Sequence, residues 1–222
     1  MSTKGAIIVL AWPQTKVTQE GKWYDTPMRL LGFLKNGYYT VGHAAFVLVD
    51  FDTLEFKYYD FGRYHTPAKH GRVRSYDTDP ELKLTSKAEI KEGKIQNIDV
   101  LMAELQAKKA CHGDGDLWTS VYYNINLAKA TRKAKAMQDV GTICYGPLNI
   151  KGTNCSRFVS QVTKTATNCW FMKLKLTLPY TVSASPKFNI RIINQSMNYY
   201  VLKKENQTVT QNKTLIPKII VW

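Results

Sequence analysis

The amino-acid sequence predicts a fold that contains both β-strands and α-helices. Strand-like segments rich in apolar and β-branched residues dominate the first third of the chain, and segments with helical spacing of apolar residues follow from about residue 98. Hydrophobic residues make up 44% of the 222 residues, which is enough for a substantial core. No internal repeat or linker interrupts the chain, so we expect a single domain over residues 1–222, with a less certain C-terminal extension from about residue 180.

The first predicted element is a buried strand over residues 5–11, which are aliphatic and β-branched and precede Pro13. The apolar run is too short to span a membrane and has no cleavage pattern after it. We therefore expect no transmembrane segment and a cytoplasmic protein, unless a leader has been trimmed. Residues 27–34 then predict a short helical turn with Pro27 at its first position.

A β-hairpin is predicted by residues 38–49, a turn at residues 50–53 and residues 54–61. If the turn is centred between Phe51 and Asp52, His43 lies opposite Asp60, on the same face of the sheet. A register shifted by one residue would bring Tyr59 or Phe61 opposite His43 instead. Phe-Asp is not a preferred two-residue turn, so this alternative stays open.

A basic loop is predicted over residues 62–76, directly after this hairpin. Arg63, Arg72 and Arg74 in this loop are candidates for binding an anionic group on a substrate, because guanidinium groups pair well with carboxylates and phosphates. The alternative, a solvated loop of a basic protein, is equally consistent with the sequence.

The remaining elements are predicted from residue spacing and turn signals. Residues 98–108 predict a helix that buries Ile98, Leu101, Met102 and Leu105, and residues 126–140 predict a helix ended by Gly141. The other expectations are strands at residues 82–84 and 117–123, a turn at residues 111–116, a half-exposed strand at residues 170–178, and either a strand pair or an ordered tail from residue 199 to the terminus.

Cys155 is predicted to lie in the first turn of another helix. Gly152 and Thr153 are the breaker and capping candidates, and Phe158 and Val159 begin an apolar helical face. Unpaired backbone N–H groups and the positive end of the helix dipole favour a thiolate at such a position. The alternative is that Cys155 is a small buried apolar residue without reactivity.

Composition limits the function classes. A formal net charge of +14 and a pI near 9.6 suggest an anionic partner, such as a membrane surface or an acidic polymer. Nucleic acid is disfavoured, because the lysines are scattered and no RNA-binding signature is present. The four cysteines form no C-x-x-C pair, and the adjacent Cys111 and His112, with Cys144, have no usual zinc-ligand spacing. We therefore expect free thiols, no metal and no cofactor.

Cys155, His43 and Asp60 together suit nucleophilic catalysis. A cysteine nucleophile needs a base to take its proton, and the base needs a third polar group to fix its orientation. The backbone N–H of Cys155 could stabilise a developing oxyanion. His65, His70 and His112 are weaker candidates for the base, because each lies in a predicted loop.

Two blocks of sequence resemble a known family. Tyr145-Gly146, followed by residues 152–159, resembles the NlpC-type branch of the papain-like cysteine hydrolases, and residues 41–44, Val-Gly-His-Ala, resemble its histidine strand. The histidine precedes the cysteine here, which is similar to the circularly permuted branch that contains the lecithin retinol acyltransferase-like proteins. Asn154 precedes the nucleophile, as in those acyltransferase-like members, whereas peptidoglycan hydrolases of the branch carry Asp.

The resemblance implies a papain-like α+β fold with a central antiparallel sheet and the nucleophile helix packed on it. It implies Cys155 as nucleophile, His43 as base, Asp60 as the third polar residue, and Tyr145 as a hydroxyl near the thiol or the oxyanion. The implied activity is hydrolysis or acyl transfer at an amide, ester or thioester bond of a small-molecule, peptide or acyl substrate. The alternative is a noncatalytic papain-like scaffold that binds an anionic partner through its basic surface.

Overall fold

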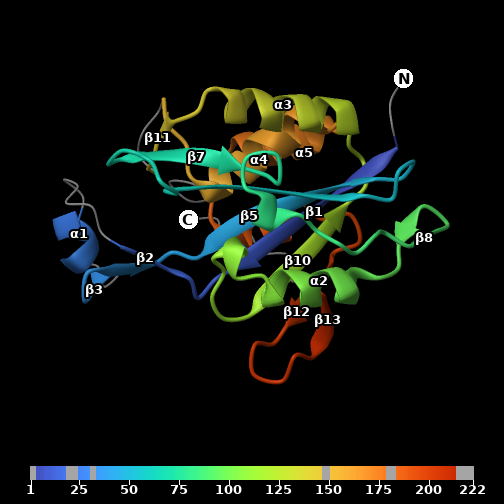
Figure 1. Cartoon of the computed structure of the whole chain (residues 1–222), viewed down its shortest axis with the longest axis horizontal. Helices are drawn as coiled ribbons and strands as arrows, with labels where there is room; N and C mark the ends of the chain where they lie inside the picture. Colours follow the sequence, from blue (N-terminus) through green and yellow to red (C-terminus); the bar gives the residue numbers. More distant parts are fainter. Residues whose placement is uncertain (1–3, 19–24, 31–33, 147–150, 179–183, 214–222) are drawn as a thin grey trace.

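The computed structural model describes residues 4–18, 25–30, 34–146, 151–178 and 184–213. Its main feature is an eight-stranded sheet with the order β11-β7-β6-β5-β1-β10-β12-β13, in which every neighbouring pair is antiparallel. β1 (Gly5–Trp12) runs between β5 (His43–Asp50) and β10 (Leu117–Tyr122). The predicted α+β class with a large antiparallel sheet is confirmed (Figure 1).

The other elements surround these strands. The main sheet also contains β6 (Phe56–Gly62), β7 (His70–Arg74), β11 (Ile143–Cys144), β12 (Asn198–Leu202) and β13 (Val209–Lys213). Two small sheets are formed by β2 (Lys16–Thr18), β3 (Leu34–Lys35) and β4 (Tyr38–Thr40), and by β8 (Ile90–Lys91) and β9 (Lys94–Ile95). The helices are α1 (Asp25–Leu30), α2 (Ile98–Ala107), α3 (Leu127–Asp139), α4 (Cys155–Ala166), α5 (Trp170–Thr177) and α6 (Pro186–Ile192), with 3₁₀ turns at Pro80–Leu82 and Lys109–Cys111.

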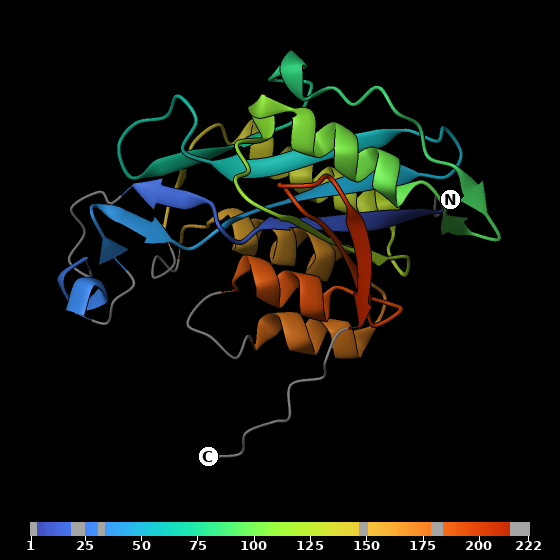
Figure 2. The ribbon, with the colours of Figure 1, turned by 90° about the horizontal axis from the view of Figure 1, so that it is seen from below.

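Both faces of the sheet are covered. Helices α3, α4 and α5 lie on one face and α2 on the other, as Figures 1 and 2 show from two directions. Because side chains alternate along a strand, Ile7 and Val9 of β1 join the core under α3 and α4, whereas Ile8 and Leu10 join the core under α2. No helix among the described residues is long and apolar enough to cross a membrane.

The helices predicted from apolar periodicity are present. α2 buries the four predicted residues Ile98, Leu101, Met102 and Leu105, and α3 ends before Gly141, whose φ is +78°. α4 begins at Cys155 as expected, but its capping residue is Asn154, whose side chain accepts a hydrogen bond from the Arg157 N–H at 2.9 Å. Neither Gly152 nor Thr153 caps this helix.

The predicted hairpin is present with a different register. Asp60 pairs with Ala45 rather than His43, because the turn contains two more residues than predicted. A shift of two residues keeps His43 and Asp60 on the same face, as diagonal neighbours. The single long strand predicted over residues 38–49 is wrong: β4 belongs to a small sheet, and Gly42, with φ +75°, separates it from β5.

Three further predictions are corrected. Residues 82–84 are not a strand, since Leu82 closes a 3₁₀ turn. The predicted basic loop contains β7, which pairs with β6. Residues 170–178 form helix α5: Met172 and Leu176, four residues apart, are buried, whereas a strand would have buried every second residue. α1 begins at Asp25, so Pro27 is its third residue rather than its first.

The C-terminal alternatives are resolved in part. Residues 199–213 contain the strand pair β12 and β13, which completes one edge of the main sheet. The apolar end of the chain, residues 219–222, lies outside the described residues, as do residues 31–33 of the predicted helical turn at residues 27–34.

Candidate active site

The thiol of Cys155 lies at the first residue of α4, beside the start of β5. The first N–H groups of a helix have no carbonyl partner within it, and the dipole there favours negative charge. Cys155 is 7% exposed, so the sulfur is largely shielded from water while remaining at the edge of the core. Its side chain contacts the ring of His43 and the backbone N–H of Ala44.

His43, the first residue of β5, lies between Cys155 and Asp60. Its Nε2 atom is 3.5 Å from Asp60 Oδ2, and no other hydrogen-bond partner of Nε2 is present among the described residues. This long contact resembles those of catalytic histidines without substrate, which often tighten only when the substrate binds. Because Nε2 faces Asp60, Nδ1 is the ring nitrogen left for the thiol.

The pKa values of the two facing groups shift in opposite directions. Burial alone would lower the pKa of His43, but interactions with Asp60 and Cys155 outweigh it and raise the pKa to about 9. Burial would raise the pKa of Cys155, but the His43 ring and the Ala44 N–H hold it below its ordinary value. Near neutral pH this arrangement favours a thiolate facing an imidazolium.

Asp60 is fully buried and remains charged because Arg74 accompanies it. Arg74 donates two hydrogen bonds to its carboxylate, Nε to Oδ1 at 3.0 Å and Nη2 to Oδ2 at 2.6 Å. The hydroxyls of Tyr58 and Tyr64 also donate to Oδ2, at 3.0 and 3.2 Å. Burial would raise the pKa of Asp60, but His43 and Arg74 together hold it below its ordinary value. The carboxylate is therefore a fixed negative charge beside the imidazole.

The three arginines predicted to bind substrate are in different situations. Arg74 is 2% exposed and pairs with Asp60, and Arg72 forms a two-pronged ion pair with Asp79 at 2.7 and 2.6 Å. Arg63 donates to a backbone carbonyl at 2.9 Å and lies over the Tyr145 ring. A role for Arg72 or Arg74 in substrate binding would require these internal ion pairs to break, so it stays a prediction that the contacts do not favour.

Tyr145 is held beside the start of α4. Its ring stacks on Phe61, with centroids 5.8 Å apart and planes 6° from parallel, and its backbone bridges to Thr153. The segment carrying Tyr145 and the loop before Cys155 are thus joined. A contact between the Tyr145 hydroxyl and the thiol or an oxyanion stays a prediction.

The other histidines contact different partners. His70 Nε2 lies 3.6 Å from the Cys144 sulfur, the His112 ring stacks on Tyr64, and His65 is exposed. Among the described residues, no three His, Cys, Asp or Glu side chains gather closely enough to hold a metal ion.

The sequence did not predict the residues that enclose the Cys155–His43 pair. Trp12, the last residue of β1, pairs with His43 and stacks on its ring at 5.8 Å. Its indole N–H donates to Gln106 of α2 at 3.1 Å, and a Cβ at Gly113 would lie 2.3 Å from the indole ring, so only glycine fits there. The available signal was positional, because Trp12 ends a strand that is the neighbour of the histidine strand.

Comparisons with known proteins agree with this architecture. No curated protein sequence matches the chain significantly. The chain is similar in structure to a protein whose crystal structure is described as that of the type VI secretion system effector TseH, with a TM-score of 0.62 and 18% sequence identity over 96% of this chain and 100% of that one. At this identity the likeness concerns the fold. A family model described as type VI secretion system effector TseH-like matches residues 7–170, most of the chain and all of the predicted site, so the chain belongs to the family of TseH-like type VI secretion system effectors.

Proposed function

We propose that this protein is a cysteine-dependent hydrolase that cleaves amide bonds. The observation that carries the proposal is the position of His43, which contacts the Cys155 thiol on one side and lies 3.5 Å from the Asp60 carboxylate on the other. The order of these residues, with the histidine first, supports a permuted papain-like arrangement of the kind found in the lecithin retinol acyltransferase-like branch.

Cys155, His43 and Asp60 have distinct roles in the proposed reaction. The Cys155 thiolate attacks the substrate carbonyl carbon, and the backbone N–H at the start of α4 donates to the resulting oxyanion. The His43 imidazolium gives its proton to the leaving nitrogen, the C–N bond breaks, and a thioester to Cys155 remains. Neutral His43 then takes a proton from water, whose oxygen attacks the thioester carbonyl. The C–S bond breaks, the acid is released, and the Cys155 thiolate and the His43 imidazolium are restored. Asp60 keeps the imidazole oriented throughout.

An amide substrate is favoured by the raised pKa of His43, which is about 9. An amine leaving group must be protonated as the C–N bond breaks, and a histidine that stays protonated at neutral pH can supply that proton. Ester and thioester leaving groups need this proton less. Acyl transfer to a second acceptor in place of water uses the same thioester and is the nearest alternative.

The site of action is also part of the proposal. The family is named for effectors of a secretion system, which supports action after export. We propose that the cytoplasm, the location expected from the sequence, is where the protein is made, and that its substrate lies beyond the cell that makes it.

Thiol reactivity provides the first test. Brief alkylation with iodoacetamide at neutral pH, followed by peptide mapping, should modify Cys155 faster than Cys111, Cys144 or Cys169, because only a thiolate reacts rapidly. Equal rates at Cys155 and Cys111 would contradict the proposal.

Product analysis provides the second test. The wild type and Cys155→Ala are incubated with peptide amides, including the stem peptides of bacterial peptidoglycan, and with matched ester and thioester analogues. Mass spectrometry should find new amine and carboxylate ends that depend on Cys155. A noncatalytic anion-binding protein would instead give no products and salt-sensitive binding that is equal in the two proteins.

A further inference from the structure

Helix α5 exposes an apolar surface to solvent. Met172 and Leu176 face inward and are buried, yet the opposite side is also apolar. Its exposed large side chains, which we call the outer face of α5, are Trp170, Phe171, Leu174 and Leu178, with exposed fractions of 73%, 50%, 45% and 69%. A helix of a soluble protein normally carries polar residues on the side away from the core, so an apolar outer face indicates an interaction surface.

Cations flank this outer face and no acids balance them. Helical spacing puts Lys173 and Lys175 on opposite sides of the apolar stripe, and the Lys175 ammonium lies 4.5 Å from the Phe171 ring. Residues 151–178 contain no Asp or Glu at all. On the adjacent helix α3, Asp139 pairs with Lys135 of the same helix at 3.2 Å. The surface is therefore positively charged as well as apolar.

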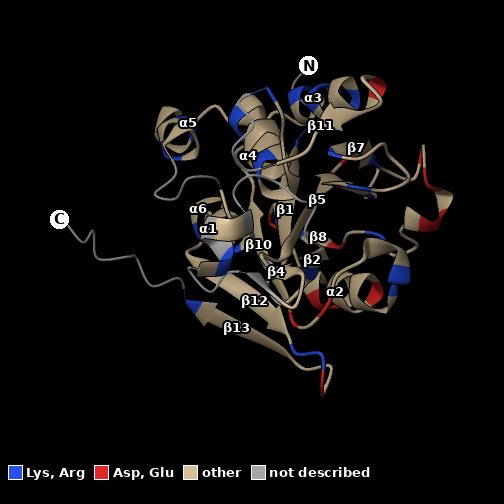
Figure 3. Ribbon diagram, turned by 90° about the vertical axis from the view of Figure 1, so that its left-hand side faces the viewer, with Lys and Arg blue, Asp and Glu red and all other residues tan. Residues whose placement is uncertain are grey.

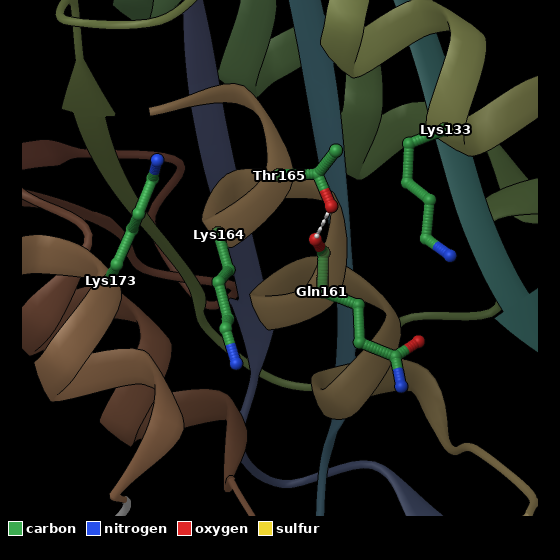
Figure 4. A pocket seen from close by; sticks show the side chains of 5 residues that line it. All are labelled: Lys133, Gln161, Lys164, Thr165 and Lys173. Atoms are coloured by element: carbon green, nitrogen blue, oxygen red, sulfur yellow. Dashed lines mark hydrogen bonds between the residues drawn. The ribbon is translucent and has the colours of Figure 1, made fainter. Parts of the chain in front are cut away.

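An open hollow of about 400 Å³ lies beside the outer face, between α3, α4 and α5. Its lining residues are Lys133, Gln161, Lys164, Thr165 and Lys173 (Figure 4). Each of the three helices contributes one lysine, and Lys164 lies between the other two in that view. The hollow adds Lys133 and Lys164 to the cations beside the outer face, and a lysine ammonium attracts a phosphate as a point charge.

We propose that α5 and this hollow dock the protein onto an anionic phospholipid bilayer. The outer face would enter the boundary between the headgroups and the acyl chains, with Lys164, Lys173 and Lys175 at the level of the headgroup phosphates. A nucleic acid would match the charge and could stack on the two aromatic rings, but it offers nothing to Leu174 and Leu178. An acyl layer accommodates all four side chains.

The proposed docking surface is separate from the candidate active site. Cys155 begins α4, whereas Lys164 lies nine residues later, about 14 Å along the helix axis. Figure 3 shows α5 at the periphery of the molecule, beside α4. Docking through α5 would leave the start of α4 unobstructed, and the inference does not depend on the proposed catalytic activity.

Vesicle co-sedimentation tests the proposal. The full-length protein should bind vesicles made of equal parts phosphatidylglycerol and phosphatidylcholine, bind pure phosphatidylcholine vesicles at least tenfold more weakly, and lose affinity as salt is raised. Lys164→Gln combined with Lys173→Gln should lower the partition coefficient roughly thirtyfold, since each lysine near an anionic surface contributes about fivefold. Trp170→Ser combined with Phe171→Ser should abolish measurable binding and leave the circular dichroism spectrum unchanged.

The matched control is Lys91→Gln combined with Lys94→Gln, which removes the same charge from the exposed β8–β9 hairpin. It should change vesicle binding less than threefold. Equal losses in the two lysine pairs would overturn the proposal, because net charge alone would then explain binding. Undiminished binding by the variant with Trp170→Ser and Phe171→Ser would also overturn the proposal. So would a protein that does not bind anionic vesicles but binds duplex DNA or polyglutamate in a Lys164-dependent way.

Discussion

Cys155 and Cys111 are both buried thiols, yet they differ chemically. Burial, together with the negative charge of Asp60, raises the pKa of Cys111 to about 12, although Tyr58 and Arg74 oppose the shift. Burial acts in the same direction on Cys155, but His43 reverses the outcome and the pKa falls below its ordinary value. Exposure therefore does not decide which thiol is reactive, since Cys111 is 1% and Cys155 7% exposed.

Local backbone position reinforces the difference. Cys155 is the first residue of a helix, where N–H groups lack partners and favour an anion. Cys111 is the last residue of a 3₁₀ turn, where carbonyl oxygens are left over and disfavour one. An imidazole on one side and a helix start on the other therefore distinguish the candidate nucleophile from a core cysteine.

Replacement of His43 should have the largest effect on this comparison. His43→Ala removes the group that lowers the pKa of Cys155, while burial of the thiol remains, so alkylation of Cys155 by iodoacetamide at neutral pH should fall to the slow rate of Cys111. Activity on amides should fall by about a thousandfold or more, as when one member of a catalytic unit is removed. Both rates are measured on the same preparation.

His70→Ala is the matched control, because His70 contacts a different thiol, that of Cys144, at 3.6 Å. It should leave the alkylation rate of Cys155 and the proposed amidase activity unchanged within about twofold. A His43→Ala protein whose Cys155 still reacts rapidly would show that the helix start alone activates the thiol.

Much of the fold followed from the sequence because local patterns determine it. The apolar face of α2 and the glycine after α3 are local signals, and both helices were predicted with nearly correct bounds. α5 was mistaken for a strand because apolar and basic residues alternate in it, and only its packing against α4 decides between the two periods. The hairpin register depended on turn length, which the residue types did not specify.

The reacting groups of the candidate site could be predicted from the sequence, but the residues that hold them in place could not. The position of Cys155 at a helix start is a local property, and the contact with His43 required only that the histidine lie at a strand end nearby. The partner of Asp60 is non-local, because Arg74 reaches it only through the pairing of β7 with β6. A basic segment in sequence gives no sign that one of its arginines is buried against a carboxylate.

Replacement of Arg74 should have the second-largest effect. It should lower the stability of the fold rather than change the reactivity of either thiol directly. Arg74→Met leaves the Asp60 carboxylate buried without its counterion, which costs about 3 kcal/mol of unfolding free energy. Urea denaturation followed by tryptophan fluorescence measures the loss. Arg72→Met breaks the more exposed pair with Asp79 and should cost only about 1 kcal/mol. Equal losses would mean that Asp60 does not depend on Arg74.

Cys111→Ala should have the smallest effect, and the pH dependence of its stability tests whether burial keeps the Cys111 thiol neutral. Amidase activity should stay within about twofold of wild type, and the unfolding free energy at pH 7 should fall by about 1 kcal/mol, since only one buried sulfur is lost. The folded protein holds the Cys111 thiol neutral up to a pKa of about 12, whereas an unfolded thiol ionises near its ordinary value of 9.0. The stability contributed by the neutral thiol is thus fully present below pH 9.0 and is lost as the pH rises toward 12.

In parallel urea titrations, the stability advantage of the wild type over Cys111→Ala should therefore shrink as the pH rises above about 9 and reverse by about pH 10.5, because only the wild type has a thiol that ionises more readily on unfolding. Tyrosine and lysine ionisation affects the two proteins alike and cancels in the difference between them. A stability difference that stays constant over this range would mean that Cys111 ionises as readily in the folded protein as in the unfolded chain. Burial would then not be the reason why Cys111 is less reactive than Cys155.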